Sequence, residues 1–200
     1  MNLTIKPLTP DLTDDYLYFF ENEVSHDNPD QDWDRCYCIC FASDDHSTIP
    51  DPSLPSQRRD MAVEYIKNGK LQGYLAYDKE RVVGWVNANT KTNCTKCFSW
   101  LRFVKDVPVD IKENIKSIFC FAIAPDMKRK GIASALLTRV CDDAAKDGFD
   151  AVECYPNTHF ANEFDDFRGP MKLFEKHGFH IYHELDGWNV VRRETATDVY

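Results

Sequence analysis

The segment from Ala122 to Leu137 constrains the fold of this 200-residue chain more than any other. An apolar run ends at Pro125, the basic triplet Lys128-Arg129-Lys130 follows, and Gly131-Ile132-Ala133 opens an amphipathic pattern. This order predicts a strand, a short loop and a helix. The first turn of such a helix presents unpaired amide N–H groups and the positive end of the helix dipole. The Gly and the Ala leave the backbone open, so the segment predicts a pyrophosphate cradle. The alternative is a basic helix N-terminus in which these two small residues only help packing.

The other hydrophobic patterns predict a mixed α/β chain. Strands are expected at 3–8, 36–41, 73–77, 82–87, 115–123, 150–155, 179–185 and 188–193. Helices are expected after Thr9 and at 57–68, 130–147 and 170–177. The early strands suit antiparallel pairing, and the late strand–helix–strand order suits a parallel crossover. A chain of 200 residues is expected to form one domain over 1–200.

The net charge and the hydropathy pattern argue against two classes of binding partner, nucleic acids and membranes. The net charge of −9 argues against a dedicated nucleic-acid binder, which needs a concentrated cationic face. No run of 18 apolar residues is present, so no membrane partner is expected. The first residues, Met1 to Lys6, carry no signal-peptide pattern, which leads us to expect a cytoplasmic protein.

Two motifs at compatible spacing resemble the GCN5-related N-acetyltransferases, the GNAT superfamily. Lys128, Gly131 and Ala133 match the pattern Arg/Gln-x-x-Gly-x-Gly/Ala that follows a strand in that family. The second motif, Leu173 to Phe179, is similar to the family segment Leu-Tyr-x-Lys-x-Gly-Phe. The resemblance implies the GNAT acyl-CoA N-acyltransferase fold, a central mixed sheet flanked by helices. Against that fold, residues 21–60 and 88–113 look like insertions.

The resemblance also implies an activity. Acetyl-CoA would lie between the strand that ends at Ile123 and the strand that ends near Tyr155. A primary amine would attack the acetyl group directly, without an acyl-enzyme. Positions implied to bind the cosubstrate are Phe121, Ala122, Ile123, Lys128, Arg129, Lys130, Gly131, Ile132, Ala133, Ser134 and Phe174. The acceptor would be a small-molecule or peptide amine, and the chain a monomer or homodimer.

The chain departs from the family at the proton donor. Many members carry a Tyr where this chain has Phe174, and Phe has no proton to give to the departing thiolate. Tyr155 and Glu153, two residues apart on one strand, are the expected catalytic substitutes. Glu153 could also deprotonate or bind the amine, or it could be a solvated strand residue. Phe167 and Pro170 also replace residues that are usual in the family. A non-catalytic acyl-CoA sensor on the same fold is therefore the alternative function.

Cysteines and aromatic residues leave further options open. The eight cysteines are Cys36, Cys38, Cys40, Cys94, Cys97, Cys120, Cys141 and Cys154. Only Cys94 and Cys97 have metal-like spacing, and no partner His pair accompanies them, so we expect no metal. Candidates for lining an acceptor pocket are Trp33, Tyr37, Trp85, Trp100 and Phe103, although aromatic residues more often fill a core. Acidic loops at Asp27, Asp30, Asp32, Asp34, Asp44 and Asp45 would suit a cationic acceptor or would simply be solvated.

Overall fold

A seven-stranded mixed sheet forms the centre of the protein in a computed structural model, which describes residues 3–24, 36–48, 52, 54–159 and 167–195. The strands are β1 (Leu3–Pro7), β2 (Gly73–Asp78), β3 (Arg81–Thr90), β4 (Ile115–Ile123), β5 (Ala151–Cys154), β6 (His180–Leu185) and β7 (Trp188–Glu194). They lie in the order β1-β2-β3-β4-β5-β7-β6. Only the β4–β5 pair is parallel. The predicted mixed α/β sheet is confirmed.

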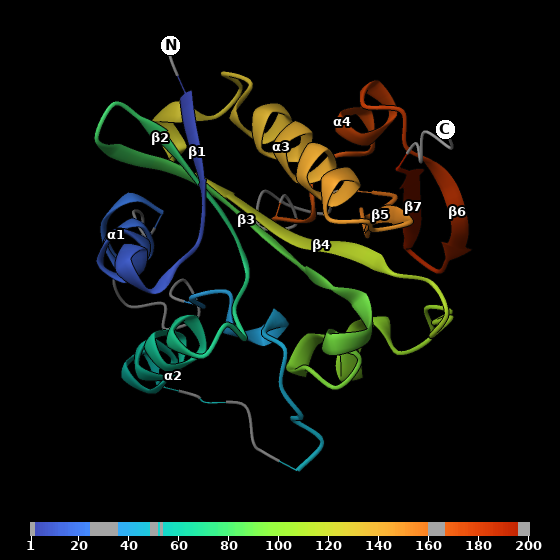
Figure 1. The fold of residues 1–200 in the computed structure, drawn as a ribbon, viewed down its shortest axis with the longest axis horizontal. Helices are drawn as coiled ribbons and strands as arrows, with labels where there is room; N and C mark the ends of the chain where they lie inside the picture. Colours follow the sequence, from blue (N-terminus) through green and yellow to red (C-terminus); the bar gives the residue numbers. More distant parts are fainter. Residues whose placement is uncertain (1–2, 25–35, 49–51, 53, 160–166, 196–200) are drawn as a thin grey trace.

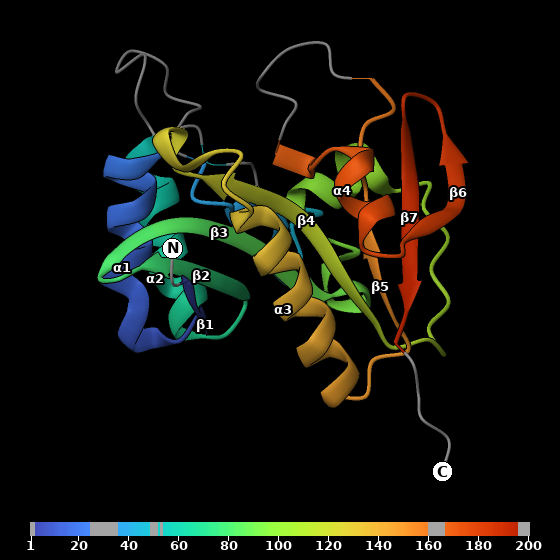
Figure 2. The ribbon, with the colours of Figure 1, turned by 90° about the horizontal axis from the view of Figure 1, so that it is seen from above.

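Helices cover both faces of the sheet (Figure 1). The α-helices are α1 (Thr13–Tyr18), α2 (Pro55–Lys67), α3 (Ile132–Lys146) and α4 (Met171–Lys176). Gly84 of β3 faces Ile132 and Leu136 of α3, and the next residue, Trp85, packs edge-on against Tyr16 of α1. Because successive strand residues point to opposite faces, α3 and α1 lie on opposite sides of the sheet, as Figure 2 shows.

Short helical turns are also present in the described part of the chain. They are η1 (Pro10–Leu12), η2 (Phe19–Glu23), η4 (Ile39–Phe41), η5 (Lys91–Cys94), η6 (Trp100–Val104) and η7 (Pro125–Met127). η5 and η6 lie within the predicted insertion at 88–113, and β3 extends into this segment as far as Thr90. Among the described residues, no helix is both long and apolar enough to cross a bilayer.

The predicted strand at 36–41 is wrong. Tyr37 and Cys38 have φ values of 45° and 49°, and a 3-10 turn follows at Ile39–Phe41. The left-handed conformation is incompatible with a strand. The segment is apolar because the turn is buried, not because it pairs with a neighbouring strand. Cys36 and Cys40 therefore do not alternate with Cys38 along a strand.

The close approach of β2 to β3 depends on Gly73. A Cβ atom there would lie 2.1 Å from the carbonyl oxygen of Val86 and 2.4 Å from the ring of Trp85. We expect Gly73→Ala to lower the free energy of unfolding by about 3 kcal/mol, the upper end of the usual cost of overpacking, because a backbone oxygen cannot move aside. Gly84→Ala is the matched control, since its Cβ would meet only side-chain ends, the nearest being Cγ2 of Ile132 at 2.8 Å. Denaturant titration should show the smaller loss for Gly84→Ala, and the reverse order would contradict this assignment.

Candidate active site

The basic loop and the start of α3 form an open backbone cradle. Arg129 and Gly131 both have left-handed backbones, with φ of 62° and 83°, and Gly131 is the N-cap of α3. The amide of Ala135 donates the first hydrogen bond of the helix to the carbonyl of Gly131 at 3.0 Å. The amides of Ile132, Ala133 and Ser134 precede that bond, so they have no carbonyl four residues back within the helix. Alternating left-handed residues and free first-turn amides make a concave anion site.

Gly131 serves this cradle through its backbone conformation and the space above it. A Cβ atom at this position would meet no atom within 4 Å, so the cradle is open there. Lys128, Arg129 and Lys130 are exposed on its rim. The residues present therefore fit a pyrophosphate group.

An arginine fork fixes the loop that leads into the cradle. Arg81, at the start of β3, donates to both carboxylate oxygens of Asp126, at 2.8 and 2.9 Å, and to Glu23 at 2.6 Å. Hydrogen bonds from Arg81 lower the pKa of the exposed Asp126 carboxyl group. The fork joins η7 to the β2–β3 hairpin and to η2, so the loop has a defined position before any ligand binds.

The strands β4 and β5 separate beside the cradle. Their pairing covers only Ile115–Ile118 and Ala151–Cys154, whereas β4 continues to Ile123. The register with β3 skips Phe119, which forms a bulge where the parallel pairing ends. Beyond the bulge, the edge of β4 at Phe121, Ala122 and Ile123 has no β5 partner. Backbone donors and acceptors on that edge can bind an extended amide-containing chain such as pantetheine.

Phe174 of α4 closes the space beside that edge. Its ring is fully buried and lies 6.3 Å from the ring centroid of Phe121 and 5.6 Å from that of Phe179. A Cβ atom on Gly169 would lie 3.0 Å from Cζ of Phe174, so the ring end faces the backbone of Gly169. Phe174 thus provides an apolar wall and no proton.

The two predicted catalytic residues, Glu153 and Tyr155, lie together on the face of the sheet opposite α3. The hydroxyl of Tyr155 is 2.7 Å from Oγ of Ser117 and donates to Oε2 of Glu153 at 3.3 Å. Burial, followed by the charge of Glu153, raises the pKa of Tyr155 well above its usual value. Tyr155 therefore keeps its proton at neutral pH.

Glu153 is not the solvated strand residue that the sequence left as an alternative. Its side chain is 0% exposed, and both of its oxygens are engaged. Arg192 of β7 binds Oε1 at 2.6 Å, and the ammonium group of Lys91 lies 2.7 Å from Oε2. Both carboxylate oxygens are thus occupied by cations, and neither is free to take a proton from a substrate amine.

Comparison with known proteins decides the family. The model of the acetyltransferase (GNAT) family matches residues 7–179, which is most of the chain. The chain belongs to the GNAT acetyltransferase family. A search of curated proteins found no significant sequence match.

Solved structures agree on the fold of this GNAT enzyme. A GNAT acetyltransferase from Streptococcus pneumoniae has a TM-score of 0.53 at 16% identity, covering 98% of this chain and 100% of that one. The PaiA N-acetyltransferase from Thermoplasma acidophilum, solved with coenzyme A, has a TM-score of 0.55 at 12% identity, with 97% and 99% covered. The ribosomal-protein-S5-alanine acetyltransferase from Vibrio fischeri has a TM-score of 0.57 at 11% identity, with 98% and 95% covered. At these identities the likeness establishes the fold, and the family model establishes the enzyme class as an acyltransferase.

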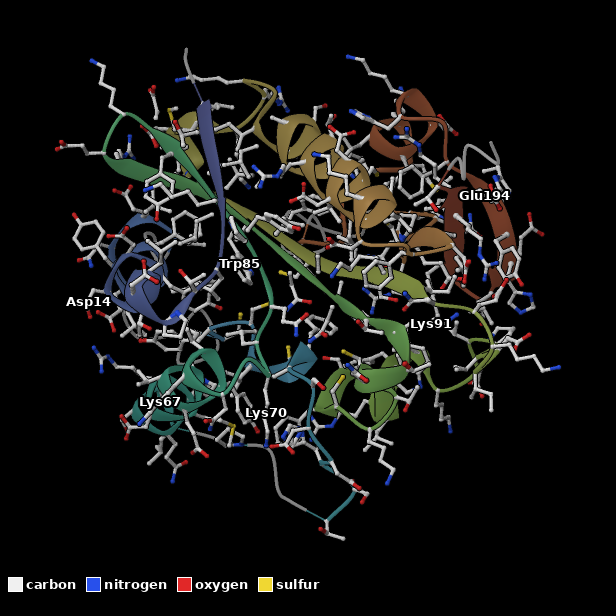
Figure 3. All side chains as sticks on the ribbon, viewed as in Figure 1. Asp14, Lys67, Lys70, Trp85, Lys91 and Glu194 are labelled. Carbon is white, nitrogen blue, oxygen red and sulfur yellow. The ribbon has the colours of Figure 1, made fainter. Side chains whose placement is uncertain are left out.

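Three further charged residues of the GNAT enzyme were missed from the sequence. Arg192 also binds Glu113 at 2.9 and 3.0 Å, and Lys91 donates to the carbonyl of Pro108 at 2.7 Å. Both Glu113 and Pro108 lie at the end of the 88–113 segment, and Lys91 lies at its start, just after β3 (Figure 3). The available signal was a lone charge inside the apolar run Val152-Glu153-Cys154, whereas Arg192 only begins the charged stretch that follows Val190-Val191. The network therefore holds the 88–113 segment on the sheet beside Tyr155.

Aromatic rings pack closely around Tyr155, and they include two of the predicted candidates for an acceptor pocket, Trp100 and Phe103. A cavity of about 10 Å³, enough for one water, is lined by Phe41, Ser99, Phe103, Val104, Phe119, Tyr155 and Arg168. Trp100 packs edge-on against Phe119 and Tyr155, at 6.2 and 6.4 Å, beside this cavity. Tyr37 and Trp85 belong to the core instead, and Trp33 lies outside the described residues.

The acidic loops give less support to a cationic acceptor than the sequence suggested. Asp44 is paired with Lys70 at 2.9 Å, and Asp45 is paired with Lys96 at 2.6 Å. The other four candidate aspartates, Asp27, Asp30, Asp32 and Asp34, lie outside the described residues. The two described carboxylates thus already have cationic partners.

The cysteines of this enzyme are free thiols. Cys94 and Cys97 are buried, and burial raises the pKa of Cys97 to about 11. The thiol of Cys94 donates to the carbonyl of Phe41 at 3.6 Å. Within the part of the chain that the structure describes, no group of three or more potential ligands could hold a metal ion.

Proposed function

We propose that this enzyme transfers an acetyl group from acetyl-CoA directly to a primary amine of a small-molecule or peptide acceptor. The observation that carries the proposal is the anion cradle at the start of α3, which lies next to the unpaired edge of β4. Acetyl-CoA, when bound, supplies an activated thioester. The amides from Arg129 to Ser134 would hold its pyrophosphate, with Lys128 and Lys130 at the rim. The backbone from Phe121 to Ile123 would hold its pantetheine, and Phe174 would bound that channel.

Binding in a fixed orientation is the main contribution that this chain can make. Holding the two reactants in a productive orientation lowers the activation free energy by roughly 7–11 kcal/mol relative to reactants in solution. The hydrogen bonds of Arg81 and the ion pairs around Glu153 hold the two sides of the site in place before substrates bind.

The cytoplasmic location expected from the sequence stays a prediction.

Tyr155 is the proposed hydrogen-bond donor to the leaving sulfur. A thiol titrates near pKa 8.5, so a tyrosine with a raised pKa stays protonated while the thiolate leaves. Complete proton transfer would be uphill, and the hydroxyl would act by hydrogen bonding to the developing charge. Glu153 accepts from this hydroxyl, and Ser117 can donate to it. Both are proposed to orient the hydroxyl, whose single proton would turn from Glu153 to the sulfur as the thiolate leaves. This assigns Glu153 to positioning rather than to deprotonating the amine. The proton that the amine loses on forming the amide would neutralise the departing thiolate, so that amide and free thiol are the products.

Tyr155→Phe tests this assignment. We expect kcat to fall by about 10²-fold, the lower end of the range for losing one hydrogen-bond donor to a developing charge, with the Kd for acetyl-CoA unchanged. Tyr77→Phe is the matched control, because Tyr77 is also buried and donates to a carboxylate, Asp15, at 2.8 Å. Steady-state kinetics and calorimetric titration measure the two quantities. An unchanged kcat in Tyr155→Phe would remove Tyr155 from the mechanism.

A non-catalytic acyl-CoA sensor is the second candidate. Phe174 lacks a hydroxyl group, and the cavity beside Tyr155 has room for one water only. Release of free thiol from acetyl-CoA with a panel of amines separates the two functions. Amine-dependent release supports the transferase, whereas tight CoA binding without release on any amine supports the sensor.

A further inference from the structure

A second cavity lies at the opposite end of β4 from the cradle. It is an open pocket with a volume of about 360 Å³, lined by the end of β1, the C-terminal end of α2, the start of β2, Ala88 of β3 and the start of β4. Lys116 of β4 lines it and lies seven residues before Ile123. At 3.3 Å per strand residue, this separates it from the acetyl-CoA end of the strand by about 23 Å. The volume falls within the range of small-molecule sites.

Lys116 is a buried cation without an acidic partner. It is 8% exposed, and its ammonium group lies 4.5 Å from the centroid of the Phe149 ring. Among the described residues, no ion pair or hydrogen bond of its side chain is found. Burial lowers the pKa of Lys116, which opposing charges on Asp147 and Asp143 only partly offset. Asp143 is itself bound to Arg139 at 2.7 Å.

The other buried lysine shows what this chain does when a lysine has a structural task. Lys91 is 3% exposed, pairs with Glu153 at 2.7 Å and donates to Pro108 at 2.7 Å. Buried charges are normally paired in this way, because an unpaired charge loses its hydration without compensation. Lys116 has only a ring face as a partner and an adjoining cavity. The nitrogen of Lys116 is not among the fully buried unpaired atoms, so a small anion in the adjoining cavity could reach it.

The residues that line the cavity indicate the chemical character of the ligand that would bind there. Its charged members are Lys116 and Lys67, and none of its residues is Asp or Glu, although the chain has a net charge of −9. Lys67 lies on the last turn of α2 (Figure 3). The apolar lining includes Leu8, Ile66 and Leu71. A carboxylate attached to a compact apolar body matches two lysines and an apolar wall.

We propose that this cavity is a binding site for a small organic acid, with its carboxylate paired to Lys116 and its apolar body against Leu8, Ile66 and Leu71. The site is distinct from the acetyl-CoA cradle and does not depend on the proposed transferase reaction. Lys67, at the rim, adds to the attraction for the anion.

Benzoate is the probe, and benzamide is its uncharged isostere. Both are titrated into the isotopically labelled full chain at saturating coenzyme A, which occupies the cradle. We expect benzoate to shift the amide resonances of Gly69 and Gly73 saturably, and benzamide to leave them unchanged. Lys116→Met should weaken benzoate binding at least about tenfold, the loss expected for one charge-assisted contact. Lys112→Met, an exposed lysine on the same chain, is the matched control.

A thermal melt gives a second reading that does not require the probe. Lys116→Met should raise the Tm, because it removes a buried charge that the fold leaves unpaired. Equal binding by benzoate and benzamide, absence of any shift, or unchanged affinity in Lys116→Met would overturn the proposal. A lower Tm in Lys116→Met would also count against it, since Lys116 would then serve the fold through Phe149.

Discussion

Gly131→Glu should weaken the binding of acetyl-CoA by at least about 100-fold, because like-charge contacts cost several kcal/mol and each 1.4 kcal/mol is tenfold in affinity. The new carboxylate would extend into the open space above Gly131, where the pyrophosphate is proposed to lie. Calorimetric titration with acetyl-CoA measures the change in Kd.

Backbone strain must be separated from charge in this experiment. Gly148, just after the C-terminal end of the same helix, has φ of 74° and equally open surroundings. Gly148→Glu therefore carries a similar conformational cost at a distance from the cradle, and it should leave the Kd unchanged. Equal losses of affinity in both variants, or no loss in Gly131→Glu, would mean that the pyrophosphate does not bind at this helix.

Arg192→Met should lower the free energy of unfolding by about 3–5 kcal/mol, the usual cost of removing one partner from a buried ion pair. Arg192 binds the fully buried Glu153 at 2.6 Å and Glu113 at 2.9 Å, and its guanidinium group lies 3.6 Å from the ring centroid of Tyr182. The remaining Lys91 would balance Glu153 only in part. Denaturant titration of the purified variant measures the loss.

The neighbouring arginine supplies the control for that experiment. Arg193 follows Arg192 on β7, so its side chain points to the opposite face of the sheet. Arg193 is half-buried beside Cys141, and no ion pair of its side chain is found among the described residues. Arg193→Met should therefore cost only about 1 kcal/mol, the typical effect of a single substitution. Arg192→Lys should fall between wild type and Arg192→Met, because it keeps the charge and loses the fork geometry. A loss in Arg192→Met no larger than that in Arg193→Met would show that the network does not stabilise the fold.

The cradle could be predicted from the sequence because it is local. Pro125, Gly131 and the amphipathic run that follows are all within one strand–loop–helix unit, and each acts on its own backbone. The same holds for the β2–β3 hairpin and the predicted helix at 57–68, which the structure places at Pro55–Lys67.

The parts that could not be predicted depend on residues far apart in the chain. Glu153 is paired with Arg192, which is 39 residues away, and Arg192 is paired with Glu113, which is 79 residues away. No periodicity links such positions. The strand predicted at 36–41 was wrong for a related reason. An apolar run indicates burial, but it does not indicate whether the buried backbone is a strand or a turn.

The proposed transfer is tested most directly by measuring acetylated amine and free coenzyme A in the same reaction. The purified chain is incubated with acetyl-CoA and a mixture of primary amines, and both products are quantified by mass spectrometry. We expect equal molar amounts of the two products, with both reduced in Tyr155→Phe and abolished in Gly131→Glu at low acetyl-CoA concentration. Acetyl-CoA binding without any acetylated amine would contradict the transferase assignment and identify the chain as a sensor.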